Sequence, residues 1–315
     1  MKNILDKKWG IVAAAVLCNL LWGSAYPGIK IGYELFGITD NLAQKLFFAG
    51  MRFVIAGIMV LAVSIPVNKR IPKMTRKNTG IILVIAFIYT ALQYVFFYVG
   101  LSNTTGTNGS IVNSSTTFIA LIASHFVYKN EHITFRKLAG ALIGFAGVIT
   151  VLVSDGISGF SFDGEGFILI AAICFVAGSM LSKYAASGTD AMTVTGYNLL
   201  IGGAMLLVAG FAGGGIPEKF SGQGIAVLLY LAVLSAAAFT IWTMLLKRTE
   251  VGRISVFNFI IPVSGTLLSA IFMKENIFEV KYLVSLILVC AGIILVNYTP
   301  KMNFLGSSKN DNSNY

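Results

Sequence analysis

Ten long apolar stretches, separated by short polar or charged segments, run along nearly the whole chain. A helix that crosses a bilayer needs roughly 20 mostly apolar residues, and these stretches reach or approach that length. Strands of a membrane barrel alternate apolar and polar residues, which these runs do not. The pattern therefore predicts an all-α polytopic membrane protein with ten transmembrane helices, at about residues 10–33, 46–66, 79–101, 108–128, 137–154, 165–185, 191–212, 224–246, 252–273 and 281–299.

The composition agrees with a lipid environment. Hydrophobic residues make up 56% of the chain and charged residues 11%, with a mean hydropathy of +0.81. Soluble domains carry roughly 25% charged residues. In a soluble protein the net charge of +10 would favour a nucleic-acid partner. Here the basic residues cluster between apolar segments, so we expect the lipid bilayer as partner and no nucleic acid.

Lysine and arginine distribute unevenly between the two sides of the predicted membrane. With the N-terminus inside, 17 of the 23 fall on inner segments and 5 on outer segments, while Arg52 lies within a helix. Cytoplasmic loops carry such an excess of basic residues. We therefore expect a multi-pass protein of the bacterial plasma (inner) membrane with both termini in the cytoplasm.

Part of the chain is repeated. Residues 110–151, moved forward by 145 positions, align without a gap on residues 255–296. Five helices per half is an odd number, so the second copy must enter the membrane from the opposite side, as in the inverted repeats of many transporters. We expect one repeat over 1–155, a second over 156–300, and a disordered cytoplasmic tail over 301–315.

Several short motifs carry a family resemblance: Leu21-Trp22-Gly23-Ser24-Ala25-Tyr26, Arg52-Phe53 with Ala56, Lys274-Glu275, and Ala291-Gly292. Both halves resemble the EamA family of the drug/metabolite transporter superfamily, over nearly the whole chain. The resemblance implies a ten-helix carrier of small metabolites, often an exporter of amino acids or related compounds. It also implies a central cavity lined mainly by segments 1, 3, 4, 6, 8 and 9. The family's mid-helix proline is present at Pro262, whereas its repeat counterpart is Thr117.

Arg52 is a candidate for substrate binding. It lies about seven residues into the second segment, roughly 10 Å deep at about 1.5 Å per residue. A charge there costs several kcal/mol unless it is paired or hydrated. It could hold the carboxylate of an amino-acid-like substrate, or instead extend outward, or pair with Glu34 or Asp40. Its repeat counterpart Asn198, also a candidate, is uncharged.

Asn113 and Asn258 occupy equivalent positions of the two repeats. Because the repeats are inverted, the two amides are expected near opposite membrane surfaces. An amide in hydrocarbon needs a hydrogen-bond partner. Each could therefore bind substrate or bridge neighbouring helices.

Aromatic and amide side chains in three segments are candidates for a cavity wall. An apolar wall with a few polar tips suits a small, partly hydrophobic solute. Tryptophan and tyrosine also anchor helices at membrane interfaces, which is the alternative for these residues. The candidates are Trp22, Tyr26, Gln93, Tyr94 and Trp242.

Three further residues are candidates for motion or coupling. Pro27 and Pro262 lack an amide donor and should loosen their helices, as expected of hinges in transporters. His125 is a weaker candidate for proton coupling: its ordinary pKa lies near neutrality, but a lone histidine near a helix end is more often a structural residue. No carboxylate lies in the middle of a predicted span, so facilitated export down a gradient fits better than ion coupling.

Other classes of protein find less support. The chain has two histidines, His125 and His132, and lacks the sequences typical of metal-dependent, serine and nucleotide hydrolases. We therefore expect no enzyme, metal or cofactor; an intramembrane enzyme or a non-transporting membrane protein is the alternative. The spacing of Gly140 and Gly144 favours close helix packing or a homodimer through the fifth or tenth segment.

Overall fold

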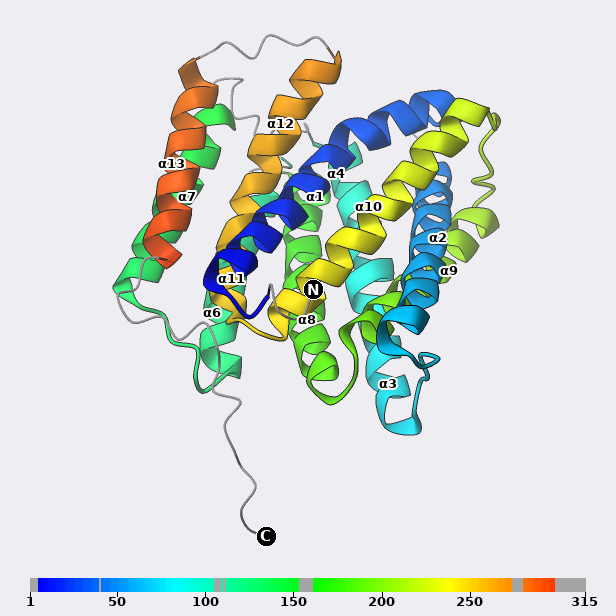
Figure 1. The fold of residues 1–315 in the computed structure, drawn as a ribbon. Coiled ribbons are helices and arrows are strands. Elements are labelled where there is room, and N and C mark those ends of the chain that lie inside the picture. Colours follow the sequence, from blue (N-terminus) through cyan, green and yellow to red (C-terminus); the bar gives the residue numbers. More distant parts are fainter. Residues whose placement is uncertain are drawn as a thin grey trace.

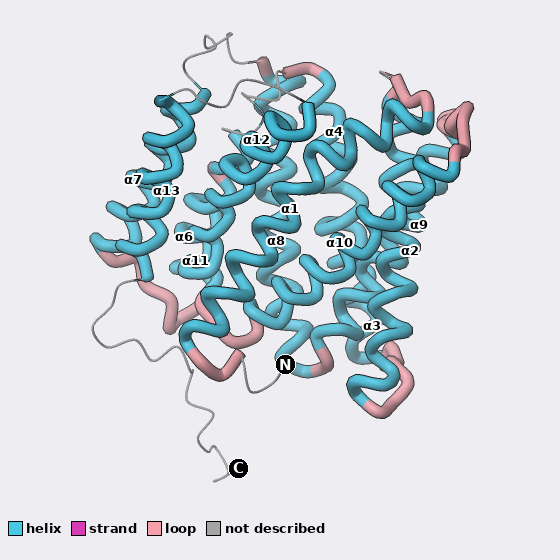
Figure 2. Tube along the Cα trace, turned by 45° about the horizontal axis from the view of Figure 1, so that its top comes forward, coloured by secondary structure: helices cyan, strands magenta, loops and turns pink. Residues whose placement is uncertain are grey.

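The computed structural model describes residues 5–39, 41–104, 109, 112–152, 161–273 and 280–297. All regular secondary structure in these ranges is helical, which confirms the all-α fold class (Figure 2). The predicted tail at 301–315 and the predicted boundary between the repeats, at 155/156, lie outside the described residues.

Every predicted apolar stretch coincides with helical structure over its described residues. In chain order the elements are α1 (Lys8–Phe36), α2 (Leu42–Asn68), α3 (Arg76–Ile85), the π-helical turn η1 (Ala86–Leu92), α4 (Gln93–Ser102), α6 (Thr116–Val127), α7 (Phe135–Leu152), the π-helical turn η3 (Phe162–Gly166), α8 (Phe167–Gly188), α9 (Ala191–Ala212), α10 (Gly222–Leu246), α11 (Val251–Ile254), the 3-10 turn η4 (Ser255–Phe259), α12 (Ile260–Met273) and α13 (Val280–Asn297).

Within the described ranges, six helical stretches are long and apolar enough to cross a bilayer, judged by length and composition. They are Lys8–Phe36, Leu42–Asn68, Asn78–Ser102, Phe162–Gly188, Ala191–Ala212 and Gly222–Leu246. Shorter apolar helices cover Val112–Val127, Val251–Gly265 and Leu283–Asn297. These helices support a multi-pass membrane protein, whereas the count of ten spans remains a prediction.

The helices pair between the two halves of the chain (Figure 1). At one side of the bundle α2 lies along α9, and at the other side α7 lies along α13. Between these pairs α1 packs on α10 and α12, while η1 and α4 pack on α8. The halves are therefore interleaved rather than separate.

Glycines bring the paired helices into backbone contact. A Cβ atom added at Gly57 of α2 would lie 2.4 Å from the Leu200 nitrogen of α9, and one added at Gly203 would lie 2.7 Å from the Val54 nitrogen. In the second pair, a Cβ atom at Gly140 of α7 would lie 2.7 Å from the carbonyl oxygen of Gly292 in α13. The Gly140 motif thus serves close packing within the chain, and a homodimer stays a prediction.

The two predicted hinge prolines occupy different helical environments. Pro27 is buried within α1, which continues for nine more residues to Phe36. Pro262 lies in the first turn of α12, directly after the 3-10 turn η4. Proline is tolerated near the start of a helix, because its fixed φ suits the first helical turn. The irregular backbone of this segment therefore precedes Pro262.

Candidate functional site

A cavity of about 390 Å³ lies between the helices of both halves. It lies toward one end of the bundle, because its lining residues lie in the C-terminal half of α1, the N-terminal half of α2 and along α4, which is the C-terminal part of its membrane-spanning stretch. The volume matches sites for small molecules, which are roughly 300–1,000 Å³. The lining residues are Trp22, Ala25, Tyr26, Ile29, Lys30, Tyr33, Lys45, Arg52, Gln93, Tyr94, Phe97, Tyr98, Leu101, Ser102, Asn113, Ser114, Thr116, Phe175, Phe239, Asn258, Ile261 and Pro262.

Most of the residues predicted from sequence to bind substrate meet at this cavity. They come from α1, α2, α4, the helical residues 112–114 and the η4 turn, which are far apart in sequence. Pro262 of α12, predicted as a hinge, also borders the cavity. The predicted binding residues present are Trp22, Tyr26, Arg52, Gln93, Tyr94, Asn113 and Asn258.

Four predicted residues lie outside the lining. Asn198 is buried between α9 and η1, where its Oδ1 accepts a hydrogen bond of 3.0 Å from Thr90 Oγ1. Trp242 is fully buried in α10 and donates from Nε1 to Ser179 Oγ at 3.2 Å. Pro27 follows the lining residue Tyr26 but is itself absent from the lining, as is His125 near the end of α6.

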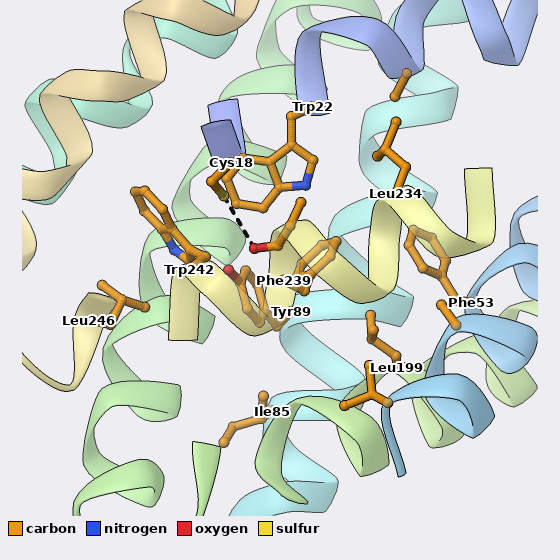
Figure 3. Packing of buried hydrophobic residues seen from close by; sticks show 14 of the residues in the cluster. Cys18, Trp22, Phe53, Ile85, Tyr89, Leu199, Leu234, Phe239, Trp242 and Leu246 are labelled. Carbon is orange, nitrogen blue, oxygen red and sulfur yellow. Dashed lines mark hydrogen bonds between the residues drawn. The ribbon is translucent and has the colours of Figure 1, made fainter. Parts of the chain in front are cut away.

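An aromatic cluster around Trp22 (Figure 3) contributes Trp22 and Phe239 to the apolar wall of the cavity. The ring centroid of Trp22 lies 5.4 Å from those of both Phe239 and Trp242, and the ring of Phe239 lies 5.5 Å from that of Tyr89. All three pairs meet edge to face, the arrangement that aromatic quadrupoles favour. Trp242 therefore supports the wall from behind, through Trp22.

Arg52 is the most deeply buried charge at the cavity, with 2% of its surface exposed. Its Nε donates to Ser235 Oγ at 2.6 Å, and its Cζ lies 5.0 Å from the ring centroid of Phe53. Burial to this extent excludes extension to the surface. Among the described residues no carboxylate lies within 4.0 Å of Arg52, so pairing with Glu34 is not observed, and Asp40 lies outside the described residues.

The charge of the lining is positive. Lys30, Lys45 and Arg52 border the cavity, and the described lining residues include no carboxylate. Lys45 is 9% exposed, and its Nζ donates to Ser102 Oγ at 3.1 Å. Sequence reasoning missed Lys45 because it was counted among the outer-segment charges. Its spacing of seven residues from Arg52, two helical turns on one face, was the available signal.

Among the described residues, two amide oxygens at the cavity have no hydrogen-bond partner. They are Gln93 Oε1 and Asn258 Oδ1, both buried. Buried acceptors are nearly always paired in folded proteins, so unpaired ones at a cavity mark positions where a ligand or water would donate. The cavity thus combines cationic groups, an aromatic wall and two open acceptors.

The opposite end of the bundle is held by ion pairs between the two halves of the chain. We call Glu131, Lys137, Lys183 and Glu250 the ion-pair cluster. Lys183 Nζ lies 2.5 Å from Glu131 Oε1, and Lys137 Nζ lies 2.5 Å from Glu250 Oε2. Glu131 Oε2 also accepts from the Gly252 nitrogen at 3.3 Å.

His125 lies at this end too, at the last turn of α6. Its ring centroid is 5.8 Å from that of His132, the residue next to Glu131. The carbonyl of His132 accepts a hydrogen bond of 2.9 Å from Lys137 Nζ. Both histidines are thus neighbours of the ion-pair cluster and not of the cavity.

Comparison with known proteins places the whole chain among transporters. The model of the EamA-like transporter family matches residues 8–153 and again 163–298. The chain is 27% identical over 310 residues to the uncharacterized transporter YvbV of Bacillus subtilis, covering 96% of this chain and 95% of the relative. It is 29% identical over 276 residues to an uncharacterized transporter of Archaeoglobus fulgidus, covering 82% and 88%.

A solved crystal structure has the same fold. It superposes with a TM-score of 0.75 and covers 92% of this chain and 96% of its own. The sequence identity is 18%, so the likeness concerns the fold alone.

Proposed function

Since the chain belongs to the EamA-like transporter family, we propose that it is a secondary transporter of small metabolites that works by alternating access. The observation that carries this proposal is the asymmetry of the bundle. One end contains a cavity bordered by both halves, while ion pairs between the halves close the other end. In alternating access, two repeats rock about a fixed site and expose it to one side at a time.

The pairing of helices supports two inverted repeats of five helices each. In chain order, the repeat counterparts are α1 and α8, α2 and α9, α4 and α10, and α7 and α13. The contact of α1 with α10 therefore has an equivalent in the contact of α8 with α4, and both are observed. The pairs α2 with α9 and α7 with α13 each join a helix to its own counterpart. Observed contacts of both kinds are what a two-fold relation between inverted repeats requires. With both termini in the cytoplasm, as the basic residues predict, the cavity faces outward.

The lining favours a solute with an anionic group and an apolar body. Arg52 and the lysines supply positive charge, and the aromatic wall around Trp22 supplies apolar contact. Amino acids and related compounds have this combination of groups. We propose net export of such solutes down their gradient, and the proposal assigns no coupling role to His125, which lies away from the cavity.

Flux measurements test this proposal. The purified full-length protein in liposomes should accelerate exchange of at least one radiolabelled member of a panel of amino acids and small aromatic carboxylates. An Arg52→Gln variant that folds normally should lose most of this flux for anionic members of the panel, because the buried charge that pairs with their carboxylates is absent. Flux no greater than that of empty liposomes for the entire panel would contradict transport of this solute class.

A reporter fused to the C-terminus tests the orientation separately. A cytoplasmic reporter activity is expected, and a periplasmic or external one would reverse the assignment of the cavity to the outer side.

A further inference from the structure

We infer that Ser235 is a positioning residue that makes this site selective for anionic solutes. Its hydroxyl fixes the guanidinium of Arg52 so that the two terminal nitrogens are presented to a carboxylate in the cavity. The inference rests on the proposed function, and it adds the chemical group that the solute must carry and the residue that orients its binding partner.

The hydrogen bonds of Ser235 leave its hydroxyl with one orientation. The Oγ atom donates to the Leu231 carbonyl at 2.8 Å and accepts from Arg52 Nε at 2.6 Å. A serine hydroxyl has a single proton, which here is committed to the Leu231 carbonyl. Its lone pairs therefore face Arg52, and with Ser235 fully buried no water competes for them.

Phe53 constrains the same guanidinium from a second direction. The Cζ atom of Arg52 lies 5.0 Å from the Phe53 ring centroid, within the range of a cation–π contact. The Phe53 ring in turn packs edge to face on Tyr94, at 4.6 Å between centroids. Serine limits rotation of the planar group and phenylalanine limits its tilt.

The remaining donors of Arg52 are suited to a planar anion. Within the described part of the chain Arg52 donates from Nε alone, which leaves two terminal nitrogens at the cavity that it lines. Arginine presents such nitrogens as a rigid fork that matches the two oxygens of a carboxylate. A buried guanidinium that has no carboxylate partner among the described residues gains most from a partner supplied by the solute.

The repeat provides an internal comparison. Thr90 and Ser235 are 145 positions apart, and Arg52 and Asn198 are 146 apart, so the two hydrogen-bonded pairs occupy equivalent places. In the second pair Thr90 Oγ1 donates to Asn198 Oδ1 at 3.0 Å, and neither residue is charged or borders the cavity. In this conformation the second pair joins the equivalent helices of the other repeat and lies outside the cavity lining.

Binding of matched carboxylates and amides tests the inference. The full chain in detergent is titrated with phenylacetate and phenylacetamide, and with L-leucine and L-leucinamide, following the intrinsic tryptophan fluorescence and the melting temperature. Wild type should bind each carboxylate better than its amide. Ser235→Ala should weaken carboxylate binding about tenfold, since a hydrogen bond to a charged group contributes about 1.4 kcal/mol or more, and should leave amide binding unchanged.

Two variants separate positioning from general stability. Ser235→Thr keeps the hydroxyl and should restore carboxylate binding. Thr90→Ala removes the equivalent hydrogen bond of the other repeat and should change the binding of both ligand types by less than about twofold. If the alanine variant of Ser235 is not recovered folded, Ser235→Cys, similar in volume but a poor acceptor, provides the same comparison.

Several results would overturn the inference. These are a wild type that does not prefer carboxylates, an equal loss of carboxylate and amide binding in Ser235→Ala, or the same loss in Thr90→Ala. The proposed function can fail separately. Carboxylate-selective binding without flux in liposomes would contradict transport and leave the role of Ser235 intact. Flux in liposomes without a preference for carboxylates would support transport and contradict the role of Ser235.

Discussion

Neutralising Glu131 should open the end of the bundle that the ion-pair cluster closes. In Glu131→Gln the bond from the Gly252 nitrogen, 3.3 Å long in the wild type, can persist because the amide retains an acceptor oxygen. The ion pair with Lys183 at 2.5 Å is lost. The substitution therefore removes one electrostatic link between the halves and little of the local volume.

The magnitude follows from burial. The side chain of Glu131 is 4% exposed and that of Lys183 is 21% exposed. Breaking a fully buried ion pair costs about 3–5 kcal/mol, and pairs at the surface contribute about 0–1 kcal/mol. For this partly shielded pair we expect a loss of about 1–3 kcal/mol, which changes the ratio of the two conformations by roughly 5- to 150-fold.

Double electron–electron resonance between two spin labels measures the ratio of the two conformations directly. Spin labels at Tyr184 of α8 and Phe135 of α7, both exposed, flank the ion-pair cluster from different halves of the chain. In detergent, Glu131→Gln should raise the population with a longer distance between the labels, relative to wild type. The same variant should reduce access of a membrane-impermeant maleimide to a cysteine placed at the cavity residue Leu101.

The matched control is Asp6→Asn, an identical chemical change in another ion pair. Asp6 pairs with Arg248 at 2.9 Å, but the side chains are 55% and 29% exposed. Solvent screens such a pair, so the distance distribution should stay as in wild type. Equal distributions for wild type, Glu131→Gln and Asp6→Asn would refute the reasoning that the cluster holds this end closed.

Two further predictions concern packing. Gly57→Val should keep α2 and α9 apart and lower the yield of folded protein, because a Cβ atom there would lie 2.4 Å from the Leu200 nitrogen. The control Gly80→Ala, with nothing within 4 Å of the added Cβ atom, should stabilise helix α3 by about 0.5–1 kcal/mol. Thermal unfolding compares the two variants. Trp22→Ala should lower the free energy of unfolding by about 3–5 kcal/mol, because it removes the centre of the aromatic cluster. Trp9→Ala, at a position 61% exposed, should lower the melting temperature far less. Similar losses in the two variants would contradict a central packing role for Trp22.

Much of the fold could be predicted because lipid imposes one structure on long apolar runs. The α9 helix spans Ala191–Ala212, the predicted range, since Asp190 caps its start and Gly213 follows its end. The segment at 252–273 was less predictable. It divides into α11, a 3-10 turn and α12, and apolar content does not distinguish these helix types.

The site was partly predictable for a related reason. Arg52 was recognisable because a charge inside an apolar run is costly wherever it points. Whether a neutral residue borders the cavity depends on which conformation the repeats adopt. Asn113 and Asn258 both border it, whereas Asn198, equivalent to Arg52, is buried against Thr90. Sequence equivalence therefore identified related positions without showing which of them the solute meets.

The glycine contacts of α2 with α9 and of α7 with α13 acquire a mechanical meaning from this asymmetry. If the halves exchange conformations during transport, the contact of α1 with α10 must adopt the packing arrangement that α8 and α4 had before, and the reverse. A helix paired with its own repeat counterpart faces the same neighbour before and after. These two glycine-lined helix pairs at the flanks of the bundle can then serve as the axes about which the halves rotate. Close backbone contact limits sliding of the paired helices during that rotation.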